Sequence, residues 1–93
     1  IGVNPQTGKA PEGGTLAQAE QVFENIKTVL AELGADTGDV LKTTVFLTNI
    51  ADFSEVNKLY AEVFGPDYPA RTCVEVSALP MGLSIEVECI AKA

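Results

Sequence analysis

The chain has 93 residues, enough for one domain and too few for two. Hydrophobic residues make up 46% of the sequence and no tract is of low complexity, which favours a globular fold over disorder. No apolar run approaches the roughly 20 residues that span a bilayer, and no charged-then-apolar leader precedes the domain, so neither a membrane partner nor secretion is expected.

The charge balance and the cysteines narrow the classes of function further. Six cationic side chains stand against thirteen anionic ones, giving a net charge of −7 with no histidine. Bulk charge of this sign does not attract a phosphate backbone, so we expect no nucleic-acid partner. Cys73 and Cys89 fit neither a disulfide framework nor a zinc site. We expect free thiols in a reducing compartment, the cytosol by default, and acid–base chemistry without histidine.

The first predicted helix follows a loop. Residues 4–14 are rich in proline and glycine and predict that loop. Thr15 as N-cap and Gln18 three residues later form a predicted capping box. Apolar residues then recur at helical spacing, at Leu16, Ala19, Phe23, Ile26, Leu30 and Leu33. Gly34 is expected to end this helix.

Residues 36–39 predict a turn, and the β-branched residues of 40–48 predict a strand. One face of this strand is expected to carry Leu41, Val45 and Leu47. The other face is expected to carry Lys42, Thr44, Phe46 and Thr48.

A second helix is predicted from Asp52 to Phe64, where Gly65 and Pro66 stop it. Asp52 and Glu55 occupy the two positions of a capping box. The apolar stripe of this helix is formed by Phe53, Val56, Tyr60 and Val63.

Two last strands are predicted over roughly 70–77 and 83–91, joined by the turn sequence ALPMG. The order helix, strand, helix, strand, strand predicts an α+β domain with two helices on one face of a sheet. We expect the last two strands to pair as a hairpin, with the side toward the helices formed by Thr72, Val74, Val76, Ile85, Val87 and Cys89. The far face then carries Arg71, Cys73, Glu86 and Glu88 together.

This far face mixes charged residues with Phe46, Cys73 and Ile90, whereas a solvated face is usually polar throughout. One interpretation is an ordinary amphipathic surface with scattered apolar residues. The other is a subunit interface where sheets pack in a ring, which we favour because so small a domain gains most from a partner.

Arg71 is the only arginine in the chain and has two interpretations. It either forms a cross-strand salt bridge with Glu86 or Glu88, or it binds a substrate carboxylate through its planar fork. Pro69 stiffens the approach to Arg71, and a cleft between subunits would make it a fixed positive group for a small anion.

The other candidate side chains also have more than one interpretation. Glu86 and Glu88 either protect a sheet edge or hold and activate a water. Cys73 lacks a histidine to activate it, so an inert packed thiol is favoured over a nucleophile. Asn57 in the second helix is most simply a solvent-facing or capping amide.

Three segments near the C-terminus carry a resemblance to a known family. YPARTCVEV (68–76), LPMG (79–82) and IEVECIA (85–91) closely resemble the closing signature of the reactive intermediate deaminase, or RidA-like, family. Residues 24–65 are similar to the two helices and central strand of that family. The resemblance covers residues 1–93 as a single RidA-like domain, and the order and spacing of the three motifs make it specific.

The resemblance implies a fold, an activity and a set of site residues. It implies a chorismate-mutase-like α+β fold with a mixed sheet, assembled as a homotrimer with clefts between subunits. It implies hydrolysis of enamines and imines such as 2-aminoacrylate and 2-iminopropionate to 2-oxo acids and ammonia, with no cofactor and no metal. Arg71 matches the residue that binds the substrate carboxylate, and Cys73 the position whose backbone holds the substrate. Glu86 matches the acid that positions water, and Asn57 an asparagine near the pocket.

Family members also have a strand or hairpin before the loop that begins at Asn4, so we expect the full protein to contain N-terminal residues that precede Ile1. Two other functions are alternatives to the deaminase. One is a non-catalytic trimer that binds 2-oxo acids, and the other is a ribonuclease or translation inhibitor, which the acidic charge disfavours.

Overall fold

The computed structural model describes Gly2 and residues 4–92. Its helices and strands are, in chain order, α1 (Gly14–Glu32), β1 (Val40–Leu47), α2 (Phe53–Phe64), β2 (Ala70–Glu75) and β3 (Ile85–Ala91). Short 3-10 turns precede β1, α2 and β3. The predicted order of elements is therefore confirmed, including the stop of α2 at Gly65 and Pro66.

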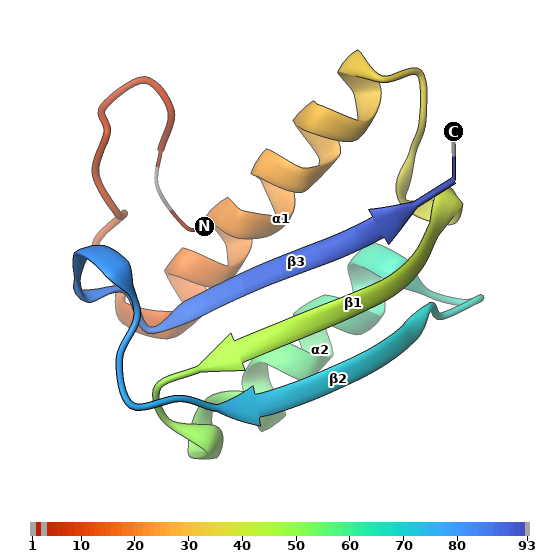
Figure 1. Cartoon of the computed structure of the whole chain (residues 1–93). Helices are drawn as coiled ribbons and strands as arrows, with labels where there is room; N and C mark the ends of the chain where they lie inside the picture. Colours follow the sequence, from red (N-terminus) through yellow and green to blue (C-terminus); the bar gives the residue numbers. More distant parts are fainter. Residues whose placement is uncertain (1, 3, 93) are drawn as a thin grey trace.

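The three strands form one mixed sheet in the order β2-β1-β3. β1 runs parallel to β2 and antiparallel to β3. Both helices cover the same face of this sheet and the other face is open, which confirms the predicted α+β layering (Figure 1). The core between the layers is formed by Ala19, Val22, Phe23, Leu30, Val40, Val45, Leu47, Val56, Tyr60, Phe64, Ile85 and Val87.

The predicted hairpin between the last two strands is wrong, because β2 and β3 flank β1 and do not pair with each other. Arg71 is the partner of Thr43 and Cys73 is the partner of Val45. Paired residues share a face, and both β1 partners are buried under the helices. Arg71 and Cys73 therefore point toward the helix layer and not toward the far face.

The open face carries the other half of the predicted set. Glu86 lies opposite Phe46, and Glu88 lies opposite Thr44. Val74 lies on the same face, since it pairs with Phe46 from the other side, so its predicted orientation toward the helices is wrong. Of the four residues predicted together on the far face, only Glu86 and Glu88 lie on the open face of the sheet. Apolar side chains lie beside them on that face.

Leu41 also departs from its predicted face. A register shift lies between Val40 and Lys42, and it leaves Leu41 56% exposed while Val40 enters the core. The extra residue of such a bulge changes the alternation of side chains on either side of it. The strand faces from Lys42 to Leu47 follow the prediction.

The predicted capping boxes of both long helices are wrong. Thr15 lies inside α1, and its hydroxyl donates to Asp52 Oδ2 at 2.8 Å, so it ties α1 to the start of α2. Gln18 Oε1 accepts from the backbone N–H of Ser84 at 2.9 Å. The predicted glycine stop of α1 is confirmed: Gly34 follows the C-cap residue Leu33 and has a positive φ of 75°, which favours glycine.

Among the described residues, no helix has the length and apolar character needed to cross a membrane.

Candidate functional site

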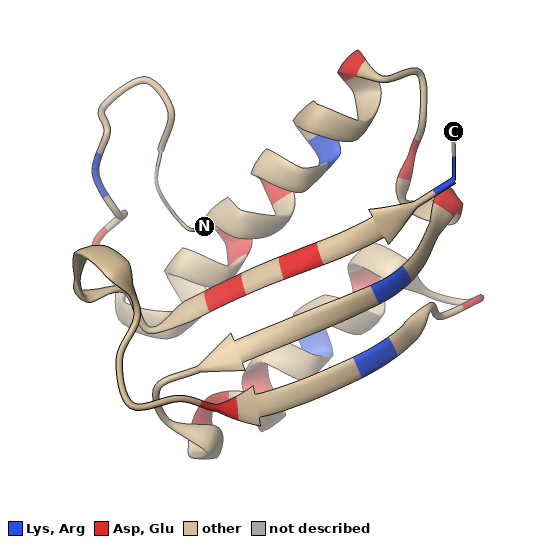
Figure 2. Ribbon diagram, in the orientation of Figure 1, with Lys and Arg blue, Asp and Glu red and all other residues tan. Residues whose placement is uncertain are grey.

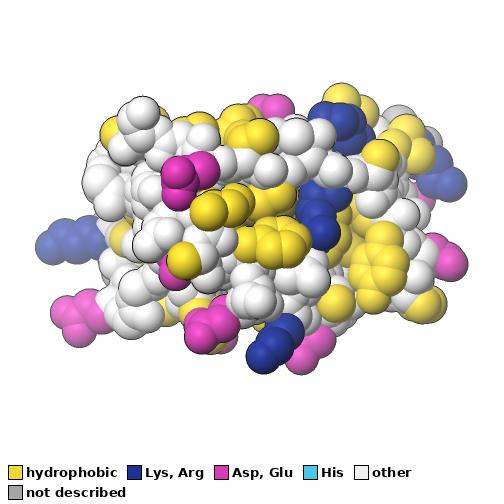
Figure 3. All heavy atoms as spheres, turned by 90° about the horizontal axis from the view of Figure 1, so that it is seen from below, with side chains coloured by type: hydrophobic (Ala, Val, Ile, Leu, Met, Phe, Trp, Pro, Cys, Tyr) yellow, Lys and Arg dark blue, Asp and Glu magenta, His cyan; other side chains and the backbone are white. Residues whose placement is uncertain are grey.

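The candidate site is a pocket between α2 and the segment that leads into β2. It is lined by Asn57, Tyr60, Ala61, Tyr68, Pro69 and Arg71, and its volume is about 450 Å³. Figure 3 views the molecule from the side of β2 and shows hydrophobic side chains gathered around a basic side chain. The pocket lies at the β2 edge of the sheet, on the face that carries the helices. There α2 covers the N-terminal end of β2 only in part.

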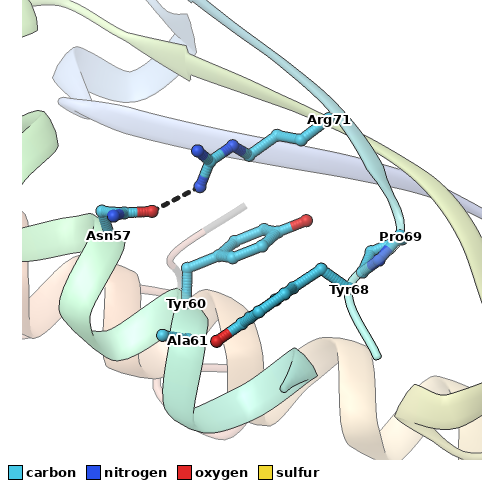
Figure 4. Close-up of a pocket in the computed structure, with 6 residues that line it drawn as sticks. All are labelled: Asn57, Tyr60, Ala61, Tyr68, Pro69 and Arg71. Carbon is cyan, nitrogen blue, oxygen red and sulfur yellow. Dashed lines mark hydrogen bonds between the residues drawn. The ribbon is translucent and has the colours of Figure 1, made fainter. Parts of the chain in front are cut away.

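The guanidinium of Arg71, an exposed residue of the single chain, lies at this pocket and contacts three side chains. Its central carbon lies 5.0 Å from the ring centre of Phe53 and 4.7 Å from that of Tyr60. Its Nη1 donates a hydrogen bond to Asn57 Oδ1 (Figure 4). Cation–π contacts of this length attract the cation and orient its plane. Asn57 therefore lines the pocket, which is open to solvent, and its interpretation as a capping amide is wrong.

Arg71 has no carboxylate partner within the described residues, where the ion pairs join Lys27 to Glu24 and Lys92 to Asp39. The cross-strand salt bridge to Glu86 or Glu88 is therefore wrong. A neutral amide takes one side of the fork and leaves the positive charge uncompensated. A planar guanidinium in this state is suited to bind a carboxylate through two hydrogen bonds.

The ring of Tyr60 contacts the Arg71 guanidinium, and the hydroxyl of Tyr60 is paired with the hydroxyl of Thr43. The Tyr60 hydroxyl lies 2.7 Å from Thr43 Oγ1, and the side chains are 3% and 0% exposed. A buried hydroxyl pair of this kind is retained because either group would cost free energy if left without a partner. The ring is also packed edge-on against Phe23 at 6.2 Å. The sequence places Tyr60 in the apolar stripe of its helix, but its second role depends on the strand order.

The backbone of β2 offers hydrogen-bonding groups at the same edge. The Val76 N–H donates to the Leu47 carbonyl at 2.8 Å, so it points toward β1. Backbone groups alternate in direction along a strand, so those of Arg71 and Cys73 point away from β1. An unpaired strand edge can bind an extended or carboxylate ligand through its N–H groups.

The thiol of Cys73 is not an activated nucleophile. Burial raises the pKa of Cys73 above its ordinary value of 9.0, and the charge of Arg71 lowers it only in part. Burial also raises the pKa of Cys89. Both thiols are free and half-buried. Because the thiolate is the reactive form, this supports the prediction of a packed thiol at Cys73.

Glu86 lies on the opposite face of the sheet from Arg71. It is half-buried beside Phe46, whereas the Arg71 pocket faces α2. Figure 2 shows the acidic positions of β3 on the strand that lies across β1 from β2. Within one chain, the predicted carboxylate-binding arginine and the predicted water-binding acid do not converge.

Cation-binding chemistry has no counterpart within the described part of the chain. No group of three or more His, Cys, Asp or Glu side chains is arranged there to hold a metal ion. The pocket itself contains one cation, one amide, two tyrosines and no carboxylate. Its donor set fits a small organic anion with an apolar portion.

The fold and the pocket thus define a small α+β domain with one arginine set against two aromatic rings at an open pocket. Comparison with known proteins identifies the family to which this domain belongs. The model of the family described as Endoribonuclease L-PSP matches residues 1–93, and the chain belongs to this family. A RutC family protein from Pyrococcus abyssi is 46% identical over 91 residues, which cover 98% of this chain and 72% of that protein.

Two further comparisons connect the chain to Rid proteins. Reactive Intermediate Deaminase A of Arabidopsis thaliana, a chloroplastic protein, is 44% identical, and the match covers 98% of this chain and 49% of that protein. The crystal structure of a Rid family protein from Yersinia pestis superposes with a TM-score of 0.96 at 46% identity, covering 100% of this chain and 75% of that one. The resemblance to the RidA-like family is confirmed.

Proposed function

We propose that this protein is a hydrolytic deaminase that converts reactive enamines and imines, such as 2-aminoacrylate and 2-iminopropionate, to 2-oxo acids and ammonia. The observation that supports it most directly is the Arg71 guanidinium, which contacts two rings and an amide and has no carboxylate partner within the described residues. Family membership and the similarity to a protein named Reactive Intermediate Deaminase A support the reaction class.

The reaction needs little beyond orientation. An enamine gains a proton at its terminal carbon and becomes an iminium ion, which is already electrophilic. Water adds to the carbon that bears nitrogen, and the adduct collapses to a 2-oxo acid and an ammonium ion. Arg71 would bind the carboxylate, and the outward backbone groups of β2 at Cys73 would align the reacting carbon. Holding both reactants in place supplies much of the rate enhancement expected for such a step.

Glu86 would position the water, and this requires more than one chain. Arg71 and Glu86 lie on opposite faces of a single-layer sheet. A site that uses both must therefore combine Arg71 of one subunit with Glu86 of another. The open face of the sheet, with Phe46, Val74 and Ile90 among its side chains, is the surface on which we propose that a homotrimer assembles.

The test of the activity is the release of ammonia from 2-aminoacrylate generated in situ. We expect the protein to accelerate release over buffer, and we expect Arg71→Lys to lose most of that acceleration. Lys27→Gln, on the exposed surface of α1, is the matched control for a lost cation. Release equal to that in buffer contradicts the enzyme and leaves the second candidate, a trimer that binds 2-oxo acids without turnover.

The two-subunit site has its own test. Arg71→Lys and Glu86→Gln proteins are each expected to be nearly inactive. When equal amounts are unfolded together and refolded, random assembly would restore intact sites in roughly a quarter of the clefts. Native mass spectrometry checks that mixed trimers form. Mixed trimers without recovered activity would contradict a shared site.

A nuclease is the third candidate, since the name of the matching family contains that activity. The net charge of −7 and the lack of histidine in the sequence argue against it. Retention of RNA that weakens steeply with salt would overturn this argument.

A further inference from the structure

The chain enters β3 through a turn whose backbone has an uncommon conformation. Met81 has a φ of 62°, and Gly82 follows it with a φ of 66°. A positive φ is open to glycine but unfavourable for a residue with a side chain, so it persists only where surrounding contacts determine it. Glu86 is the second residue of β3 and follows this turn closely. Its position therefore depends on the contacts that hold the chain between the turn and the strand.

Ser84, the last residue before β3, provides those contacts with all of its polar groups. Its carbonyl accepts from the Thr48 N–H at 3.1 Å, beside the end of β1. Its N–H donates to Gln18 Oε1 at 2.9 Å, and its hydroxyl donates to the same oxygen at 3.1 Å. In a regular antiparallel pair both backbone groups of one residue point to the same neighbouring strand, whereas here the N–H turns to α1. Figure 1 shows this turn beside the start of α1.

Resting on the proposed function, we propose that Gln18 is a positioning residue for the reaction. By binding both donors of Ser84, it closes the end of β3 and so sets the place of the Glu86 carboxylate. Only the pair of Ile85 with Leu47 lies between Ser84 and Glu86 along the ladder. The end of a strand opens more readily than its middle unless contacts beyond the last pair hold it.

The amide of Gln18 is suited to this role by its acceptor. A carbonyl oxygen has two lone pairs, which match one N–H and one O–H of Ser84. Gln18 is half-buried, so an apolar residue in its place would leave a part-buried N–H without a protein partner. A glutamate would supply the same acceptor at the same reach. Gln18 lies outside the lining of the Arg71 pocket, so its effect on carboxylate binding should be small.

The first experiment measures kcat and KM for ammonia release from 2-aminoacrylate generated in situ. Displacing a group that orients a reactant costs rate, so Gln18→Leu should lower kcat by about tenfold and change KM by less than about twofold. Gln18→Glu should keep kcat within about threefold of the wild-type value. Gln21→Leu is the matched control, since the Gln21 amide donates at 2.9 Å to Asn25 of the same helix. It should keep the wild-type kcat.

The second experiment separates positioning of Glu86 from a general loss of structure. In mixed trimers of Arg71→Lys and Glu86→Gln chains, an intact cleft would take its Glu86 from the Arg71→Lys chain. Gln18→Leu added to that chain should lower the recovered activity by about tenfold. The same change added to the Glu86→Gln chain should leave the recovered activity unchanged. A general defect of folding or assembly would lower both equally.

Each outcome supports or overturns the role of Gln18. Equal losses from the two chains, or no loss from either, would overturn it while the deaminase stands. If the wild type is active but mixed trimers recover nothing, the shared site fails and the single variants decide. Lost kcat that Gln18→Glu restores would then support the role, and a changed KM or stability alone would overturn it.

Two results need separate treatment. If Gln18→Leu does not refold, Ser84→Ala takes its place, since it removes one donor and keeps the N–H; it should show the same dependence on the chain with a loss of about threefold. Ammonia release by the wild type equal to that in buffer would overturn the proposed function, and the role of Gln18 with it.

Discussion

The hydroxyl pair of Thr43 and Tyr60 gives a prediction whose magnitude can be worked out from the structure. The two oxygens are 2.7 Å apart and the side chains are 0% and 3% exposed, so water cannot replace a lost partner. Tyr60→Phe leaves the Thr43 hydroxyl buried and unpaired, and Thr43→Val leaves the Tyr60 hydroxyl in the same state. Each change is expected to lower the free energy of unfolding by about 1–3 kcal/mol.

The double variant separates this hydrogen bond from general packing. Thr43→Val with Tyr60→Phe replaces both groups by apolar ones of similar shape, so no polar atom remains unpaired. We expect its loss to be smaller than the sum of the single losses by about 1 kcal/mol or more. Urea unfolding at one fixed protein concentration measures all four proteins, because assembly would make stability depend on concentration. Tyr68→Phe, which removes the hydroxyl of a side chain that is 59% exposed, is the control and should change stability by less than about 0.5 kcal/mol. Additive single losses would show that the two hydroxyls are not coupled.

Three further predictions concern the site and the sheet. Arg71→Lys should lower kcat/KM for imine hydrolysis by about 30-fold or more with an unchanged circular dichroism spectrum, because an ammonium ion cannot replace the fork; wild-type turnover would contradict its role. Thiolate absorbance should give Cys73 and Cys89 pKa values above 9.0, and Arg71→Gln should raise only the pKa of Cys73, because Arg71 lowers it. Since the folded state then holds more protons than the unfolded state, stability should fall as pH rises above about 9, and stability that rises there would contradict this. Leu41→Lys should change the free energy of unfolding by less than about 0.5 kcal/mol, whereas Val45→Ala should cost about 1–3 kcal/mol; equal losses would contradict the register shift.

The local patterns of the sequence were sufficient to predict the helices and strands. The stripes of α1 and α2 predict the buried residues Phe23, Leu30, Val56 and Tyr60 because a helix must bury one face in a domain of this kind. The order of elements also predicts that both helices lie on one face. Leu33 is 75% exposed, although it belongs to the predicted stripe of α1, because it follows the last residue of that helix.

The faces of the last two strands depended on information that alternation does not contain. Alternation predicts which residues of a strand share a side, but not which side faces the helices. For β3 the apolar side, with Ile85 and Val87, is buried as predicted. For β2 the polar side faces α2, because β2 is an edge strand and α2 covers it only in part. The hydrophobicity of Val74 therefore predicts the wrong side of β2, since Val74 lies on the open face of the sheet.

The placement of Arg71 and Glu86 on opposite faces of the sheet also affects the proposed mechanism. With Arg71 and Glu86 on one face, a single chain could hold both the carboxylate and the water. Placed on opposite faces, they can act on one molecule only if the edge of one sheet meets the open face of another. The apolar side chains on that open face, which a lone domain would expose to water, are accounted for by the same arrangement. If Glu86 positions the water as proposed, the site needs a second subunit, so a monomer that hydrolyses imines at full rate would remove Glu86 from the mechanism.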